Sequence, residues 1–418
     1  MTHEDPTIAR PGRGASRRRF IAAAGAASLA LGASPLLRAQ GRQAVKVSVG
    51  RQPWAAGNSP VTAYMITNKT FEKFASDAGY DVTVDYRDYP SALPMVEAFV
   101  SGNLDFGMWG NTPIVRLIAQ NQPIQLISVG EGHFRFVLAT RKDSPIRNIA
   151  DLKGKTVGAL LGGDPYNAFS QMLRYEMGNP DPRAFDITIV NTPTQAQAAT
   201  IPTGMDAAVL IYPAYLKANA ELGTVGIMNS FGYTESHYKG PAGEGAGKLL
   251  ESVKKSPFYP DGYYLHRSFW IGHANIVKNH PAVTAAFLMA QQDAVAKLSV
   301  MDPGQVSDMS KKYWELDPKL GALVVRDDVL FARGWCWPTE GDASAVLEIS
   351  KVMVEGRLIP KPLAWSQVRD SFAPAAPLLK EAYDKTGRKP DAAAFSAADA
   401  KDLRGAPAWD MTQWKERT

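Results

Sequence analysis

From Ala44 onward the sequence alternates between strand-like and helix-like segments, and this alternation limits the folds that the chain can adopt. Runs such as VKVSVG at 45–50 and VTVDYRDY at 82–89 have the composition of β-strands. The segments 61–74 and 91–100 have helical periodicity. Further strands are expected at 106–109, 124–130 and 134–140, with a helix at 113–120. Strands and helices in turn predict a mostly parallel α/β sheet.

A second series of the same signals begins after residue 154. It predicts strands at 155–161, 187–191 and 207–212, and helices at 165–177 and 194–200. Residues 232–262 are rich in glycine, proline and polar side chains, so an inserted loop is expected there. After an extended segment at 268–277, the chain from Pro281 is expected to be mainly helical, and loosely structured from about residue 387. Two such series predict two lobes.

The N-terminal segment differs from the rest of the chain. Ser16, Arg17, Arg18 and Phe20 open an apolar stretch rich in alanine and glycine, which is the pattern of a twin-arginine export signal. The stretch is too short to span a membrane, so we expect residues 1–40 to be cleaved after export to the periplasm. Of the 46 basic and 41 acidic residues, six arginines and two acids lie in this segment. The remainder is close to neutral, and no nucleic-acid partner is expected.

Motifs for catalysis or metal binding are scarce in the sequence. Cys336 is the only cysteine, which excludes an internal disulfide, a thiolate metal site and an acylated N-terminal cysteine. Its place between two tryptophans predicts a buried thiol. The six histidines are scattered, and the sequence has no G-x-S-x-G, P-loop or H-E-x-x-H motif. We predict no enzymatic activity, no metal and no cofactor.

A strand gives way to a helix-starting proline at five places. These junctions are Ser59-Pro60, Thr112-Pro113, Asp164-Pro165, Thr192-Pro193 and Tyr212-Pro213. Serine, threonine or aspartate followed by proline starts a helix well, and this alone accounts for each junction. It does not account for the glycines beside them, at positions 57, 110, 162 and 163. Glycine is useful where another group must approach the backbone closely.

The junctions also predict a ligand site. In open α/β sheets, ligands bind beyond the carboxyl ends of the strands, where helix N-termini expose unpaired N–H groups. Several such ends in one crevice can hold an anion. The candidate residues are Asn58, Asn111, Thr112 and Asn167 for hydrogen bonds, and Trp54, Trp109, Tyr166, Tyr212 and Trp270 for apolar walls. Each aromatic side chain taken alone is also consistent with core packing.

Four segments carry a resemblance to a known family. They are VEAFVSGNLDFGMWGNTPIVRLIAQNQPIQLI, IADLKGKTVGALLGG, GMDAAVLIYPAYLKA and IVKNHPAVTAAFL. Over about residues 44–380 the sequence resembles the periplasmic substrate-binding proteins of ABC importers in the nitrate, sulfonate and taurine class. The resemblance implies the two-lobed type II periplasmic binding protein fold, an α/β fold in which each lobe is a mostly parallel sheet flanked by helices.

The resemblance also implies which residues hold the ligand between the lobes. The matching positions are Gln52, Trp54, Trp109, Gly110, Asn111, Thr112, Gly163, Asp164, Tyr166 and Asn167. Tyr212 stands where the family often has a tryptophan. The sequence departs from the family at Asp164, in a turn that often carries serine or threonine. An acid there would oppose an anionic head group unless it turned away to cap the helix.

The expected organisation is one lobe from residues 44–140 and 266–380, a second from 141–265, and a C-terminal extension at 381–418. The expected function is that of a monomeric solute-binding component of an ABC importer. It binds a small organic anion, an alkyl or aryl sulfonate or an aromatic carboxylate, and delivers it to the permease in the inner membrane. Two alternatives stay open: an enzyme of the pyrimidine-precursor type on the same fold, and a sensor partner that docks on a membrane receptor.

Overall fold

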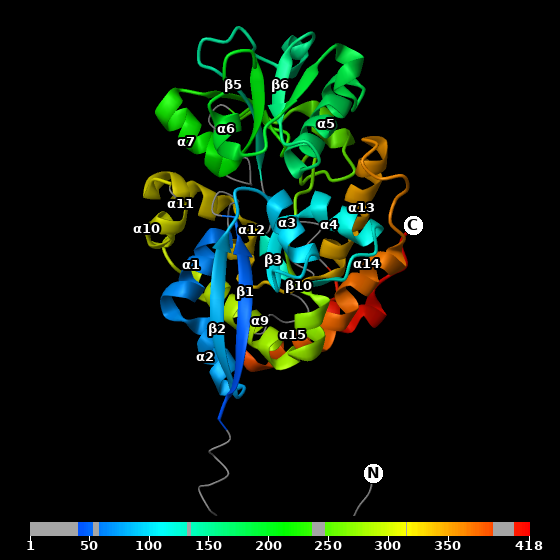
Figure 1. The fold of residues 1–418 in the computed structure, drawn as a ribbon. Coiled ribbons are helices and arrows are strands. Elements are labelled where there is room, and N and C mark those ends of the chain that lie inside the picture. The colour runs from blue at the N-terminus through cyan, green and yellow to red at the C-terminus, as the bar shows by residue number, and fades with distance from the viewer. Residues whose placement is uncertain (1–40, 53–57, 132–134, 236–246, 315, 388–404) are drawn as a thin grey trace, which may run out of the picture. The chain divides into compact units, whose positions relative to one another are not determined.

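The computed structural model describes residues 41–52, 58–131, 135–235, 247–314, 316–387 and 405–418. The predicted export signal lies outside these residues. Residues 42–418 form one unit, in which ten described strands make two five-stranded sheets with helices packed against them (Figure 1).

The first sheet has the strand order β2-β1-β3-β10-β4. Its strands are β1 (Gln43–Arg51), β2 (Tyr80–Asp88), β3 (Phe106–Gly110), β4 (Ile124–Glu131) and β10 (Ser268–His273). β1 pairs in parallel with β2 and β3, whereas β10 pairs antiparallel with β3 and β4. The chain therefore leaves this sheet after β4 and returns to it much later through β10.

The second sheet repeats this plan in the order β7-β6-β8-β5-β9. Its strands are β5 (Phe136–Thr140), β6 (Thr156–Ala159), β7 (Thr188–Asn191), β8 (Ala207–Ile211) and β9 (Val225–Asn229). β6 is parallel to β7 and β8, and β5 is antiparallel to β8 and β9. Each sheet is thus mostly parallel with one antiparallel strand inserted. β5, which the sequence grouped with the first lobe, pairs only with strands of the second sheet.

The described helices connect and cover these strands. They are α1 (Asn58–Asn68), α2 (Thr70–Asp77), α3 (Ala92–Val100), α4 (Asn111–Ala119), α5 (Asp164–Met177), α6 (Gln195–Ala199), α7 (Tyr212–Leu222), α8 (Ala274–Asn279), α9 (Pro281–Leu298), α10 (Pro303–Trp314), α11 (Pro318–Asp327), α12 (Val329–Arg333), α13 (Glu340–Glu355), α14 (Trp365–Phe372) and α15 (Ala376–Lys385). The helix expected at 61–74 is split into α1 and α2 by Lys69, whose φ is 50°. None of the helices in the described part of the chain is long and apolar enough to cross a membrane.

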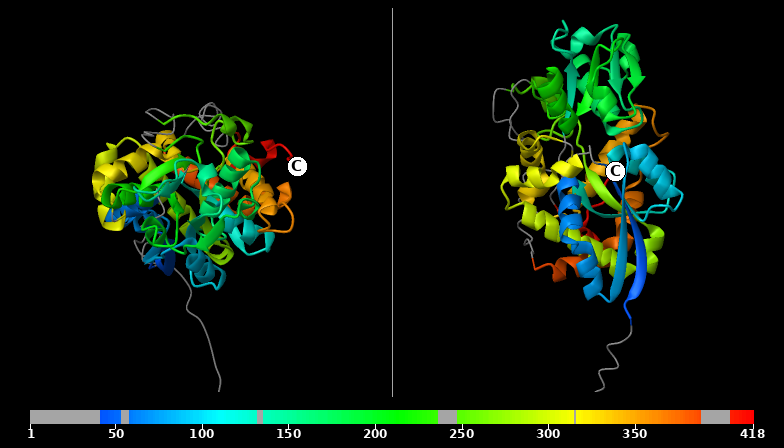
Figure 2. Two further views of the ribbon diagram at one scale, coloured as in Figure 1. Left: turned by 90° about the horizontal axis from the view of Figure 1, so that it is seen from above. Right: turned by 60° about the vertical axis from the view of Figure 1, so that its left-hand side comes forward.

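Aromatic side chains fix the helices to the two faces of the first sheet. On one face, Phe287 of α9 stacks on Phe106 with ring centroids 4.2 Å apart and meets Trp270 edge-on at 5.2 Å. α9 packs there beside α1 and α2 (Figure 1 and Figure 2). On the other face, Phe99 of α3 meets Trp109 edge-on at 5.2 Å. Because side chains alternate along a strand, the neighbours Trp109 and Met108 point to opposite faces.

The end of the chain is better ordered than the sequence predicted. Residues 405–418 include a 3-10 helix, Ala408–Gln413, and the buried side chain of Trp414. Trp414 packs against Phe372 of α14 at 5.8 Å, and Trp409 packs against Tyr383 of α15 at 4.5 Å. The expectation of loose structure is therefore wrong for this segment, because its tryptophans bury apolar surface against two helices.

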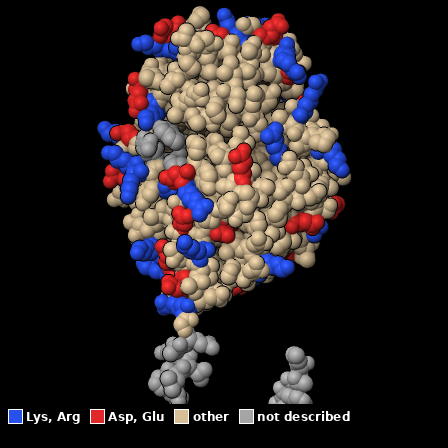
Figure 3. All heavy atoms as spheres, in the orientation of Figure 1, with Lys and Arg blue, Asp and Glu red and all other residues tan. Residues whose placement is uncertain are grey.

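Charged side chains of both signs are interspersed on the face shown in Figure 3, and no cluster of a single sign covers it. This distribution agrees with the near-neutral charge calculated for the chain beyond residue 40.

Candidate functional site

A cavity lies where strands of both sheets end and helices begin. Its empty space is about 700 Å³, part of which opens to solvent. The described lining residues are Gln52, Pro90, Ser91, Ala92, Met108, Trp109, Gly110, Pro113, Glu131, Phe136, Leu160, Gly163, Asp164, Pro165, Pro193, Gln195, Ile211, His266 and Ser268. The parallel strands β3, β6 and β8 end here, and the antiparallel strands β5 and β10 begin here. This is the location at which open α/β sheets bind ligands.

Four helices start at the cavity. Their N-cap residues, Ser91 for α3, Gly110 for α4, Gly163 for α5 and Ile211 for α7, all line it. The junction expected at Thr192-Pro193 is shifted, because α6 begins after Thr194, whose hydroxyl accepts the N–H of Gln197.

Asp164 caps a helix, but not its own. It is the first residue of α5, yet its Oδ1 accepts the backbone N–H of Thr112 at the start of α4 (3.0 Å). The same oxygen accepts the hydroxyl of Thr112 (2.8 Å) and that of Tyr264 (2.5 Å). The N-cap role expected for Asp164 on its own helix is therefore wrong, since Gly163 is the N-cap of α5. The carboxylate links the first helix of the second sheet to a helix of the first.

The neighbouring polar residues support this arrangement from behind the cavity wall. Asn167 donates its side-chain N–H to Thr112 Oγ1 (2.7 Å), and Asn111 donates to the backbone oxygen of Leu265 (2.7 Å). Thr112, Asn167 and Asn111 are all buried and do not line the cavity. Their side chains hold Asp164 in place, together with the segment around Leu265 that leads into β10. Direct ligand contact, which the sequence predicted for these three residues, is not what this geometry favours.

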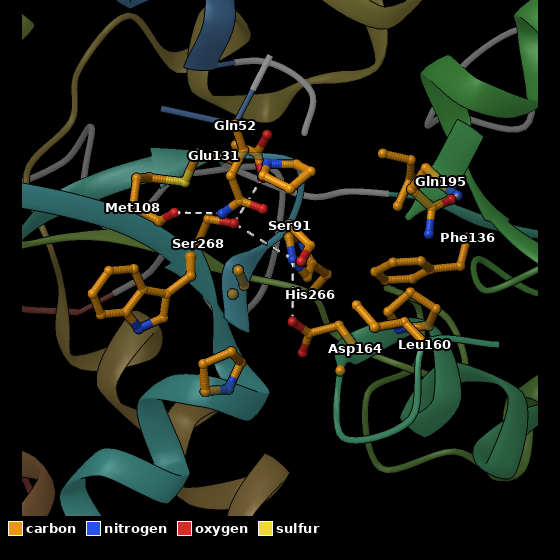
Figure 4. Close-up of a pocket in the computed structure, with 18 of the residues that line it drawn as sticks. Gln52, Ser91, Met108, Glu131, Phe136, Leu160, Asp164, Gln195, His266 and Ser268 are labelled. Carbon is orange, nitrogen blue, oxygen red and sulfur yellow. Dashed lines mark hydrogen bonds and ion pairs between the residues drawn. The ribbon is translucent and has the colours of Figure 1, made fainter. Parts of the chain in front are cut away.

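A row of polar side chains crosses the cavity from Asp164 to Glu131 (Figure 4). Asp164 Oδ2 lies 3.9 Å from His266 Nε2, which lies 3.5 Å from Ser268 Oγ. The Ser268 hydroxyl donates to Glu131 Oε2 (2.7 Å). Burial, together with the nearby Arg267 charge, lowers the pKa of His266 to about 3, so its imidazole is neutral near pH 7.

Gly110 allows Asp164 and His266 to meet at the end of β3. A Cβ atom on Gly110 would lie 2.2 Å from Asp164 Oδ2 and 2.7 Å from His266 Nε2, which is inside van der Waals contact. The glycine that the sequence singled out therefore makes room for two buried side chains of the site.

The structure places the remaining candidates in different surroundings. Gln52, Trp109, Gly110, Gly163 and Asp164 line the cavity. Trp270 lies in the core. The guanidinium carbon of Arg135 lies over the Tyr212 ring, 3.4 Å from the centroid of that ring. Tyr166 is half-buried beside the core and is not among the lining residues. Trp54 and the side chain of Asn58 lie outside the described residues.

Sequence reasoning missed His266, Glu131, Ser268 and Phe136. Glu131 directly follows the strand predicted at 124–130, so the strand-end rule applied there would have found it. His266 precedes a strand, and Ser268 and Phe136 each begin one. They reach the carboxyl edge only because β10 and β5 run antiparallel, a pairing that depends on residues distant in the sequence.

A metal site and a reactive thiol each have requirements with which the described residues can be compared. Across the described ranges, no group of three or more histidine, cysteine, aspartate or glutamate side chains is positioned to hold a metal ion. Cys336 is buried, and burial raises the pKa of its thiol to about 12. Its thiol does not line the cavity.

Asp164 is expected to reduce the stability of the protein at neutral pH. Burial is the largest effect and raises the pKa of its carboxyl, although hydrogen bonds from Tyr264 and Thr112 oppose this. Above the raised pKa, the fold holds a buried charge that the unfolded chain exposes to water; below the ordinary value of 3.8, both states are protonated and the cost vanishes. Asp164→Asn mimics the neutral acid. It should raise the unfolding midpoint at neutral pH by a few degrees, and this gain should shrink as the pH falls.

Thermal unfolding of the wild type and Asp164→Asn across a pH series checks this expectation. Asp151→Asn is the matched control: backbone hydrogen bonds lower the pKa of Asp151, so its removal should lower the midpoint at neutral pH. Two results contradict the account. One is an unfolding midpoint of Asp164→Asn that is not higher than that of wild type at neutral pH. The other is a difference between the two midpoints that grows toward acid pH.

Comparisons with known proteins agree with this architecture. The described fold is similar to the alkanesulfonate-binding protein SsuA from Xanthomonas axonopodis pv. citri, with 17% identity, a TM-score of 0.58, and coverage of 79% of this chain and 98% of that one. It is similar to the periplasmic nitrate-binding protein NrtA from Synechocystis PCC 6803, with 12% identity, a TM-score of 0.58, and coverage of 85% and 92%. The desulfurization enzyme DSZB is also similar, with 15% identity, a TM-score of 0.52, and coverage of 81% and 99%.

The fold is therefore the two-lobed α/β fold of periplasmic binding proteins, as predicted. The family model described as NMT1/THI5 like matches residues 74–303, more than half of the chain, and the chain belongs to this family. The resemblance to substrate-binding proteins of the nitrate and sulfonate class is confirmed at the level of family and fold. A search of curated proteins by sequence found no match.

Proposed function

We propose that this protein is the extracytoplasmic solute-binding component of an ABC importer. One observation carries the proposal: strand ends and helix starts from both sheets line a single cavity that contains buried polar groups. Such a cavity suits a small organic molecule held between two lobes. Export through the twin-arginine pathway, cleavage near residue 40 and a monomeric state complete the proposal, and they are expectations from the sequence alone.

The two sheets suggest where the lobes divide. The chain passes from the first sheet to the second between β4 and β5, and it returns through residues 263–267 before β10. We place the start of the second lobe before β5, a few residues earlier than residue 141. Rotation about these two crossings would open and close the cavity and present the bound molecule to a permease in the inner membrane.

The walls of the cavity constrain the bound molecule. Met108, Phe136 and Leu160 provide apolar surface that fits the body of an alkyl or aryl compound. The acidic head group predicted from the sequence fits less well, because the carboxylates of Asp164 and Glu131 also line the cavity.

An enzyme on the same fold is the second candidate, and the contact between Asp164 and His266 is the observation that favours it. A histidine whose pKa is lowered to about 3 is a weak base near pH 7, and the thiol of Cys336 lies elsewhere. Solute binding therefore explains the site better than turnover.

A neighbouring permease and ATPase gene would distinguish an import component from a sensor partner that docks on a membrane receptor.

A thermal-shift screen of the mature protein tests this function. Its panel holds small organic acids, amines, amides and sulfonates, and turnover of each hit is followed by mass spectrometry. We expect at least one compound to stabilise the protein and to remain chemically unchanged. A compound at 100 times its Kd stabilises the fold by about 2.7 kcal/mol. Conversion of the hit supports the enzyme instead, and a panel without any hit counts against the solute-binding role.

A further inference from the structure

The helix starts at the cavity give it positive potential, and the protein itself supplies the balancing negative charge. α3, α4, α5 and α7 have nine or more residues each, and their N-termini meet at the cavity. Each N-terminus is equivalent to about half a positive charge. Four of them amount to about two charges, which two carboxylates, Asp164 and Glu131, are sufficient to offset. The cavity does not need an anionic ligand for electrostatic balance.

Asp164 occupies the position at which a bound anion would sit. An anion at a helix N-terminus accepts backbone N–H groups, and Asp164 Oδ1 already accepts the N–H of Thr112 at the start of α4. Hydroxyl donors from Thr112 and Tyr264 fix that oxygen, and Asn167 fixes Thr112. An anionic head group approaching α4 would meet a carboxylate in place of free donors.

The charge at the cavity also depends on the lysine and arginine residues around it. Its described lining contains no lysine or arginine. The segments 53–57 and 132–134, which adjoin lining residues in the sequence, contain none either. Arg51 Nη2 lies 2.5 Å from Asp88 Oδ1. The guanidinium of Arg135 lies over the Tyr212 ring, and its Nη2 is 3.6 Å from Glu235 Oε1. Arg267, which lies between the lining residues His266 and Ser268, donates to Asp342 Oδ1 at 3.0 Å. Each of these three arginines therefore has a carboxylate partner of its own.

One carboxylate oxygen remains available to a ligand. Among the described residues, Asp164 Oδ2 accepts no hydrogen bond from another side chain, and it lies 3.9 Å from His266 Nε2. A ligand N–H group in the cavity can donate to this oxygen, and a hydrogen bond to a carboxylate is stronger than one between neutral groups. Met108, Phe136 and Leu160 offer apolar surface for the remainder of the molecule.

We infer that the cavity selects small organic molecules whose head group is an N–H donor, cationic or uncharged, attached to an apolar body, and that it discriminates against sulfonates and carboxylates. This inference rests on the proposed solute-binding function and names the ligand class of the same site. Asp164 is the residue that accepts a hydrogen bond from the head group and so distinguishes donors from anions. Glu131 adds to the negative potential across the cavity.

Four probes with one ring and different head groups test the inference by calorimetry on the mature protein. They are benzylamine, benzamide, benzoate and benzenesulfonate. We expect benzylamine or benzamide to bind wild type at least about 10-fold more tightly than both anions. This ratio corresponds to about 1.4 kcal/mol. Asp164→Asn should lower the affinity for benzylamine by a similar factor. The ratio of the affinities for benzylamine and benzoate should therefore decrease or reverse.

Asp206→Asn is the matched control, because the Asp206 carboxylate also accepts a backbone N–H, that of Thr156 at 2.8 Å, but does not line the cavity. It should leave all four affinities unchanged. If Asp164→Asn does not fold, Glu131→Gln provides the second variant. It should also lower the affinity for benzylamine.

Equal or tighter binding of benzoate or benzenesulfonate to wild type overturns the inference while leaving the solute-binding function intact. Binding of none of the four probes also counts against the inference. Failure of the function itself is recognised separately, by the absence of any hit in the thermal-shift screen.

Discussion

Gly110→Ala is expected to abolish ligand binding at the cavity. The added methyl group would lie 2.2 Å from Asp164 Oδ2 and 2.7 Å from His266 Nε2. Neither side chain can move away easily, because Asp164 is held by three hydrogen bonds and His266 is buried. We expect the affinity for any compound that stabilises wild type to fall by about 100-fold or more, about 2.7 kcal/mol. Overpacking should also lower the free energy of unfolding by about 1–3 kcal/mol.

The backbone of Gly110 does not itself require glycine, since its φ of −79° is accessible to alanine. This makes Gly356→Ala a close control: Gly356 has a φ of −75°, and a Cβ there would approach its nearest neighbour only to 3.6 Å. Calorimetry with the same compound should find normal affinity for Gly356→Ala. Normal affinity for Gly110→Ala would show that the contact between Asp164 and His266 is not part of the binding site.

Trp109→Ala should cause a large loss of stability. Only 1% of the Trp109 surface is accessible, its indole lies over Gly107, and it meets Phe99 edge-on at 5.2 Å. Truncating a buried tryptophan to alanine costs about 3–5 kcal/mol. Urea denaturation followed by circular dichroism measures this loss. Because so little of the side chain is accessible, the affinity of the remaining folded protein should change by less than about 10-fold, or 1.4 kcal/mol.

Trp270→Ala provides the comparison. Trp270 is equally buried, but it lies on the opposite face of the first sheet against Phe287 and does not line the cavity. Both variants should lose similar stability. A Trp109→Ala variant that keeps wild-type stability but loses affinity would assign Trp109 to the binding surface and contradict its placement in the core.

Much of the fold could be predicted because strand and helix signals are local. The central strands β3 and β8 are buried on both faces and read as short apolar runs, each followed by a proline near the start of a helix. β9 was missed because Val225–Asn229 is short and contains a glycine. The break at Lys69 was also missed, since a left-handed residue within a periodic segment has no clear sequence signal.

The site was predictable in location but less so in its chemistry. The convergence of helix starts follows from strand ends and prolines, and it drew attention to Gly110 and Asp164, which line the cavity. Which side chains point into the cavity depends on long-range pairing. Asn111, Thr112 and Asn167 look like ligand donors in the sequence. In the structure, however, Asn111 donates to the Leu265 carbonyl, Thr112 to Asp164 and Asn167 to Thr112.

Native mass spectrometry of the protein purified from the periplasm, without refolding, tests the central claim most directly. Wild type should carry a small molecule that is released on denaturation, and Gly110→Ala prepared in parallel should carry none. A bound mass of the same size on both proteins would place the ligand elsewhere. Absence of any bound molecule on wild type, together with chemical conversion of added compounds, would contradict the account of a solute-binding protein.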